Sequence, residues 1–152
     1  VTFCEGYYEW PAIHKLADVL DLISVHSYPY HYGTDIADAV SMNQKHYADI
    51  QAMYPDQQVI FTELGWSSHN STPNYYATTG NVRREIIPDK DAPRRASLQN
   101  EKRYIEEVSA WLEQAQIVGF LFEAFDEWWK SEKPSDSECN FGLYTIDRVK
   151  KW

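Results

Sequence analysis

One stretch decides the fold of this chain: Val59-Ile60-Phe61-Thr62-Glu63-Leu64-Gly65-Trp66. Its first four residues favour extended structure, and they lead directly into the carboxylate of Glu63. A glycine and a tryptophan follow at once, at Gly65 and Trp66. This order predicts a buried strand whose C-terminal tip carries an acid, with an indole ring beside it.

An acid beside an aromatic ring at a strand tip suits sugar chemistry. A carboxylate can attack or stabilise the oxocarbenium-like carbon of a glycoside, and a flat ring can stack against a sugar. Glu63 is therefore the candidate catalytic residue, and Trp66 is a candidate sugar platform. The alternative is a glutamate that ends a strand and only meets solvent.

Composition limits the remaining choices. The 152 residues suit one domain with a real core, and they carry 14 basic and 23 acidic side chains, a formal charge of −9. This charge argues against a nucleic acid or an anionic membrane as partner and suits a neutral substrate. No apolar run approaches the length of a membrane span. Val1 already begins a predicted strand, so any signal peptide lies upstream or has been removed, and the protein is secreted or periplasmic if the upstream region carries one.

Apolar strands alternate with amphipathic helices along the chain. Strands are predicted at 1–4, 22–25, 59–62 and 117–122, and helices at 11–20, 36–53 and 98–115, the last capped by Ser97. Strands and helices in this order predict a parallel sheet covered by helices. Residues 66–96 show no clear periodicity, so we expect a long binding or mobile loop in which Tyr75 and Tyr76 extend a groove.

Polar or aromatic residues follow every predicted strand, and no glycine-rich phosphate loop does. In a (β/α)8 barrel of the TIM type the active site lies at the C-terminal ends of the strands, which favours this fold over a doubly wound sheet. Residues at or just beyond these ends become candidate substrate-binding residues. They are Glu5, His26, Tyr28, Tyr30, Trp66, Glu123, Glu127 and Lys130.

The strand ends together resemble a known family. The stretches 1–5, 23–30, 61–67 and 122–130, with Phe141-Gly142-Leu143-Tyr144 near the end, resemble glycoside hydrolase family 17 in order and spacing. The resemblance implies a retaining enzyme acting on β-1,3-linked glucans, with Glu63 as nucleophile and Tyr28 in contact with it. It also implies that Glu127 and Lys130 lie near the active site. The family's Gly-Trp-Pro-Ser reads Gly-Trp-Ser-Ser here, which should loosen the turn without moving the carboxylate.

One element of that family is absent from the sequence. Its general acid/base is a glutamate after an asparagine on strand four, whereas Asn100-Glu101 here begins a predicted helix. The resemblance therefore implies that residues 1–152 are the C-terminal half of a barrel, with strands five to eight. We expect such a chain to be inactive alone, and we interpret Glu127 as a substrate contact or an ion-pair partner of Lys130.

No cofactor is expected, and no metal site either. His26, His31, His69 and Glu63 lack the spacing that would place two ligands on one face of an element. Two alternatives to an enzyme stay open: a non-catalytic carbohydrate-binding module and a self-assembling half-barrel scaffold. Because a half-barrel leaves an apolar face open, we expect a homodimer or association with the missing N-terminal half.

Overall fold

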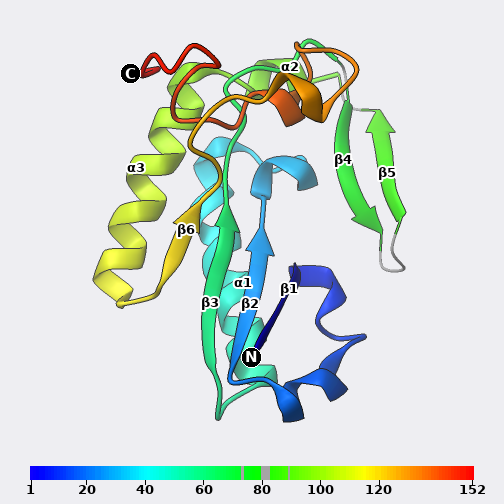
Figure 1. The fold of residues 1–152 in the computed structure, drawn as a ribbon, viewed down its shortest axis with the longest axis vertical. Helices are drawn as coiled ribbons and strands as arrows, with labels where there is room; N and C mark the ends of the chain where they lie inside the picture. The colour runs from blue at the N-terminus through cyan, green and yellow to red at the C-terminus, as the bar shows by residue number, and fades with distance from the viewer. Residues whose placement is uncertain (73, 80–82, 89) are drawn as a thin grey trace.

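A computed structural model describes residues 1–72, 74–79, 83–88 and 90–152. Its centre is a four-stranded sheet in the order β1-β2-β3-β6, and every neighbouring pair is parallel. The strands are β1 (Thr2–Gly6), β2 (Leu22–Ser27), β3 (Gln58–Leu64) and β6 (Gly119–Leu121). Their spatial order follows the chain order (Figure 1), which confirms the predicted partial (β/α) barrel.

Two long helices, α1 (Ala39–Met53) and α3 (Leu98–Ala115), cover one face of the sheet (Figure 1). The ring of Phe61 on β3 lies between Tyr47 of α1 and Trp111 of α3, with ring centroids 6.0 Å from each. At the start of α3, Ser97 Oγ accepts a hydrogen bond from the amide of Asn100 at 3.1 Å. This bond satisfies one of the free amides of the first turn and confirms the predicted cap.

The two faces of the sheet differ in cover. On the helix side, Ile23, Val25 and Phe61 are fully buried. Gly119 also faces α3, because a side chain there would collide with Leu112. Its neighbour Phe120 therefore points to the other face, where it is 57% exposed. The helices thus cover one face, and an apolar side chain remains in water on the other.

The segment predicted as the first helix differs from the expectation. Residues 11–20 contain a 3-10 helix, His14–Val19, rather than an amphipathic α-helix. Its apolar residues Leu16 and Val19 are exposed, so packing supplies little of the energy that a helix this short needs. The remaining 3-10 turns are Tyr7–Glu9, Pro29–Tyr32, Ile36–Asp38, Trp128–Lys130 and Ser137–Cys139.

The long segment after Trp66 is also more ordered than predicted. It contains two antiparallel strands, β4 (Asn74–Thr79) and β5 (Arg83–Pro88), and a short helix, α2 (Ala92–Arg95). Tyrosines, threonines and isoleucines in these strands favour extended structure, but they form no helical period. The side chains of Tyr75 and Tyr76, expected to extend a groove, lie outside the described part of the chain.

Gly65 allows the backbone after β6 to approach the tip of β3. A side chain at Gly65 would place its Cβ 2.5 Å from the carbonyl oxygen of Phe122 and 3.1 Å from Cε1 of Tyr28. Tyr28 is itself a candidate site residue, and Phe122 directly precedes another one, Glu123. The absence of a side chain at Gly65 therefore brings Tyr28 and the loop after β6 close to Glu63.

We predict that Gly65→Ala lowers the free energy of unfolding by about 1–3 kcal/mol, because a backbone oxygen cannot move aside as a side chain can. Urea unfolding measures the change. Gly6→Ala is the matched control, since nothing lies within 4 Å of a Cβ at that position. Equal effects of the two substitutions would contradict this account of Gly65.

Candidate active site

Glu63 lies near the C-terminal end of β3, as predicted, and two side chains from β2 and the turn after it face it. The register of the sheet places His26 opposite Glu63. Tyr28 donates its hydroxyl hydrogen to Glu63 Oε2 at 2.5 Å, and His26 Nδ1 lies 3.6 Å from the same oxygen. The predicted contact between Tyr28 and Glu63 is therefore present. A partly exposed carboxylate held by a phenol is free to meet a ligand through its second oxygen.

The phenol of Tyr28 is locked as a hydrogen-bond donor. Burial and the adjacent carboxylate of Glu63 raise the pKa of Tyr28 well above its usual value. The ring packs edge-on against Phe122 and Phe141, with centroids 5.7 and 5.5 Å away. Tyr28 thus remains protonated at neutral pH and fixes the orientation of Glu63.

Three charged residues after β6 form a second group at the same end of the sheet, where the strands have their C-terminal ends. Lys130 Nζ lies 2.5 Å from Glu123 Oε2 and 2.9 Å from Glu127 Oε2. The ammonium also lies 4.1 Å from the centre of the Phe122 ring. The ion pair that we expected between Glu127 and Lys130 is confirmed.

One lysine cannot compensate two carboxylates fully, and their pKa values separate. Burial raises the pKa of Glu123 to about 7, against the opposing effect of Lys130. The hydrogen bond from Lys130 lowers the pKa of Glu127. Burial alone would lower the pKa of Lys130, but its two carboxylate partners raise it. Glu127 is therefore ionised at neutral pH, whereas Glu123 titrates near it.

Two predicted substrate contacts are wrong, because their side chains lie in the core. Trp66 and Tyr30 are both fully buried, with their ring centroids 5.5 Å apart. Trp66 Nε1 donates to the carbonyl oxygen of Arg95 at 3.1 Å, and Asn70 Nδ2 donates to the hydroxyl of Tyr30 at 2.9 Å. Neither ring is available to stack on a sugar.

Glu5 lies near the C-terminal end of β1, at the same end of the sheet as Glu63, and β2 separates β1 from β3. Its Oε1 accepts a hydrogen bond from the amide of Gly6 at 2.8 Å. The C-terminal ends of the strands thus bring together Glu5, His26, Glu63 and Glu123, with Glu63 nearest to His26. In strand order, Glu5 is more distant from Glu63 than His26 and Glu123 are.

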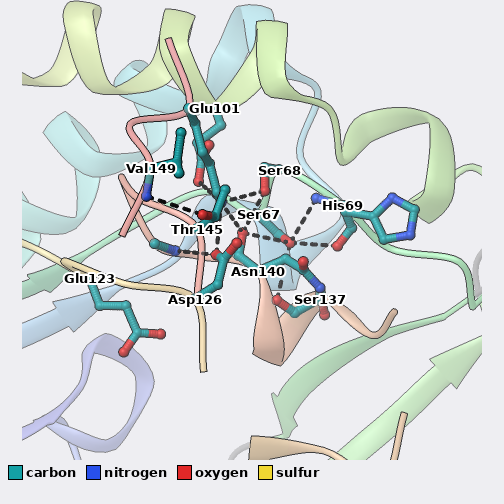
Figure 2. A network of polar contacts seen from close by, with 12 residues as sticks. Ser67, Ser68, His69, Glu101, Glu123, Asp126, Ser137, Asn140, Thr145 and Val149 are labelled. Atoms are coloured by element: carbon teal, nitrogen blue, oxygen red, sulfur yellow. Dashed lines mark hydrogen bonds and ion pairs between the residues drawn. The ribbon is translucent and has the colours of Figure 1, made fainter. Parts of the chain in front are cut away.

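Sequence reasoning missed a second charged cluster, drawn in Figure 2. Lys151 Nζ lies 2.8 Å from Asp126 Oδ1 and 3.3 Å from Glu101 Oε1, and it donates to Ser68 Oγ at 2.6 Å. The side chains of Lys151 and Glu101 are almost completely buried. Glu123 stands apart from this network in Figure 2. No local pattern joins residues 50 positions apart. The one hint of this cluster in the sequence is a glutamate on the helix face that is expected to be buried.

Burial also controls the ionisation of Glu101. It raises the pKa of Glu101 to about 8, although Lys151 opposes the shift. Glu101 Oε2 is buried and has no hydrogen-bond partner among the residues that the structure describes. Asn100-Glu101 resembles the Asn-Glu pair of the expected acid/base in sequence. The carboxyl group of Glu101 is nevertheless buried on α3 and does not lie at the C-terminal ends of the strands.

Among the residues that the structure describes, no group of three or more His, Cys, Asp and Glu side chains is arranged to hold a metal ion. The helices described here are all too short or too polar to cross a membrane. Cys4 and Cys139 are free thiols, the first exposed and the second buried.

Comparison with protein families defines the class of this domain. The model of the BtgE/BtgC glycoside hydrolase domain matches residues 1–142. The chain therefore belongs to this family of glycoside hydrolase domains. No curated protein sequence matches the chain.

Solved structures confirm the fold. A family 17 β-1,3-glucanosyltransferase from Rhizomucor miehei matches with a TM-score of 0.77 and 24% identity, over 99% of this chain and 47% of that one. An active-site mutant of that enzyme in complex with laminaritriose matches with a TM-score of 0.77, 23% identity and the same coverage. An endo-laminarinase from Formosa Hel1_33_131 gives 0.68 and 23%, over 96% of this chain and 43% of that one. The chain thus spans about half of these enzymes, as the resemblance to family 17 predicted.

We predict that Glu101→Gln flattens the dependence of stability on pH. Because the pKa of Glu101 is about 8 in the folded protein and 4.5 ordinarily, the folded state binds an extra proton between these values. The free energy of unfolding should therefore be highest below about pH 4.5. It should decrease as the pH rises toward about 8, by at most about 1.4 kcal/mol per pH unit. Glutamine cannot ionise and removes this loss.

Urea unfolding at pH 5 and pH 8 measures the effect. Glu107→Gln, on the exposed side of the same helix, serves as control and should keep the wild-type dependence. If Glu101→Gln and the wild type lose stability in parallel between the two pH values, Glu101 is not the group that titrates.

Proposed function

We propose that this domain belongs to a retaining glycoside hydrolase or transglycosylase acting on β-1,3-linked glucans, with Glu63 as the nucleophile. The observation that carries the proposal is the hydrogen bond from Tyr28 to Glu63 at the C-terminal end of a parallel strand. The bond orients one carboxylate oxygen and leaves the other for the anomeric carbon. The named activities of the structural relatives, a β-1,3-glucanosyltransferase and an endo-laminarinase, support the substrate class.

A retaining mechanism needs a second carboxyl about 5–5.5 Å from the nucleophile, which acts first as acid and then as base. Glu127 is unsuited to this part, because Lys130 keeps it ionised. Glu123 titrates near neutrality, but its Oε2 is also bound to Lys130. We propose that the acid comes from another strand of the complete barrel and that residues 1–152 alone hydrolyse poorly.

The other site residues then bind and orient the sugar. His26 lies beside the nucleophile, where its ring can donate to a sugar hydroxyl while Tyr28 holds the carboxylate. Lys130 and Glu127 present a charged pair on the neighbouring strand end. We propose that this pair binds hydroxyl groups of the glucan. Glu5, on the far strand, would contact a more distant glucosyl unit.

Exposed tryptophans favour a second candidate function, non-catalytic carbohydrate binding. Trp128 and Trp129 are 61% and 63% exposed, and they adjoin Lys130 in the chain. Aromatic rings in water are the surfaces on which sugars stack. The two candidates differ in whether Glu63 performs chemistry.

We predict that Glu63→Gln, made in the enzyme with the complete barrel, reduces hydrolysis of a β-1,3-glucan by about 10³-fold or more, because the amide is not a nucleophile. Glutamine keeps the size of the side chain, so binding of laminaritriose should persist. Reducing-sugar release and calorimetric titration measure the two properties.

The matched control is Glu113→Gln, the same chemical change at an exposed position of α3, which should leave turnover unchanged. Near-normal turnover by Glu63→Gln would disprove the assignment of the nucleophile. If the enzyme binds laminaritriose but releases no reducing sugar, the carbohydrate-binding module is the better description.

We also propose that the domain alone associates with a second copy. β1 and β6 form the two edges of the sheet, and Val118 and Phe120 are 45% and 57% exposed beside one of them. Burying such surface yields about 25 cal/mol per Å². A two-fold dimer would cover the face that α1 and α3 leave open.

Sedimentation velocity at micromolar concentration should show a dimer, and Phe120→Lys should convert it to a monomer. Val149→Lys is the control, because Val149 is equally exposed in the C-terminal tail. A well-folded wild-type monomer at that concentration would refute self-association.

A further inference from the structure

A cavity of about 390 Å³ lies beside the cluster of Figure 2, and Glu63 is not among the residues that line it. It opens between the loop after β3, the start of α3 and the C-terminal tail. Ser68 and Asp126 line it together with Lys151, while His69, Thr145 and Lys150 stand around it. Its volume falls in the range of small-molecule sites. None of its lining residues belongs to the group around Glu63 and Lys130.

The charges in the cavity wall compensate one another. Lys151 is surrounded by Asp126 Oδ1, Glu101 Oε1 and Ser68 Oγ, and it also donates to the carbonyl oxygen of Asn140 at 3.4 Å. An added anion would face the carboxylate of Asp126, and an added cation would face Lys150 and Lys151. The wall thus favours a neutral ligand over an ion.

The remaining groups match a ligand that has many hydroxyls. Asp126 uses Oδ1 for Lys151 and the amide of Gly142, and its Oδ2 has no partner among the described residues. The hydroxyl of Thr145 accepts a hydrogen bond from the amide of Val149 at 3.2 Å and can still donate to a ligand, whereas Ser68 Oγ already donates to the carbonyl oxygen of Asn140 at 2.9 Å. Leu98, 52% exposed, supplies an apolar wall. Acceptors, donors and one apolar surface in a small cavity suit the polar edge and the C–H face of a sugar ring.

The position of the cavity joins it to the rim of the barrel. Asp126 directly precedes Glu127, whose carboxylate binds Lys130 in the group near Glu63. The family model matches residues 1–142, so the wall formed by Thr145, Lys150 and Lys151 comes from a segment beyond that match.

We propose that this cavity is a second carbohydrate site, which binds one or two neutral glucosyl units of a β-glucan outside the catalytic cleft. The choice of ligand rests on the proposed function, whereas the existence of a site for a neutral polyol rests on the cavity itself. A glucan chain held there and at Glu63 would be bound at two points, and the second point raises its effective concentration at the first.

The test is a titration of the purified protein with laminaribiose, followed by the amide resonances in nuclear magnetic resonance spectra. We expect saturable shifts at residues 68–69, 98, 145 and 150–151 at about 10 mM sugar, which exceeds a weak Kd of about 1 mM tenfold. Leu98→Trp should fill the cavity and weaken these shifts at least about tenfold. Leu16→Trp, at a similarly exposed leucine outside the cavity, should leave them unchanged.

Two outcomes would overturn the proposal: no saturable shift in the cavity residues, or equal binding by Leu98→Trp and the wild type. Inorganic phosphate, a charged probe, should not compete, and competition would contradict a neutral ligand. Failure of the proposed function has a different signature. In that case amides near His26 and Glu63 would not respond to laminaribiose, while the cavity residues still would. The variant Glu63→Gln should leave the cavity shifts as they are.

Discussion

The parallel pairing of β2 with β3 is the constraint on which the site depends. Its register places His26 opposite Glu63, after a shift between Val25 and His26. Because side chains alternate along a strand, a slip of one residue would turn Glu63 to the other face and separate it from Tyr28. The close approach of Phe122 to Gly65 then positions the loop after β6 against the same strand tip. The strand ends, together with Tyr28 in the turn after β2, thus set the geometry of the candidate nucleophile.

Two lysines organise the charges beyond these strand ends. Lys130 holds Glu123 and Glu127 near the sheet edge, and Lys151 holds Glu101 and Asp126 further out. Since Asp126 and Glu127 are neighbours in the chain, the outer cluster also anchors the loop that carries the inner one. A buried charge is stable only when it is compensated, so each lysine ties together segments distant in sequence. The same compensation makes the cavity beside Lys151 suited to a neutral ligand.

Much of the fold could be predicted because its signals are local. Apolar runs gave the four parallel strands, and spacing together with Ser97 gave α3 and its first residue. The segment after Pro11 misled, because its apolar residues have helical spacing but Leu16 and Val19 are exposed rather than packed in the core. The strands β4 and β5 were not predicted, because each is only 6 residues long and leaves no helical period. Periodic spacing of apolar residues predicts a helix or strand that packs one face in the core. The prediction fails where no face packs or where the pattern is short.

The sequence by itself determined that Glu63 ends a buried strand and that His26, Tyr28 and Glu123 follow or end neighbouring ones. Parallel strands bring their C-terminal ends to one edge, so the order of motifs was enough to group them. Only the tertiary structure decided which aromatic rings face water: Trp66 and Tyr30 are buried, while Trp128 and Trp129 are exposed. It alone also joined Glu101 to Lys151. Burial and ion pairing depend on contacts between residues far apart in the chain, and no local pattern of residues encodes those contacts.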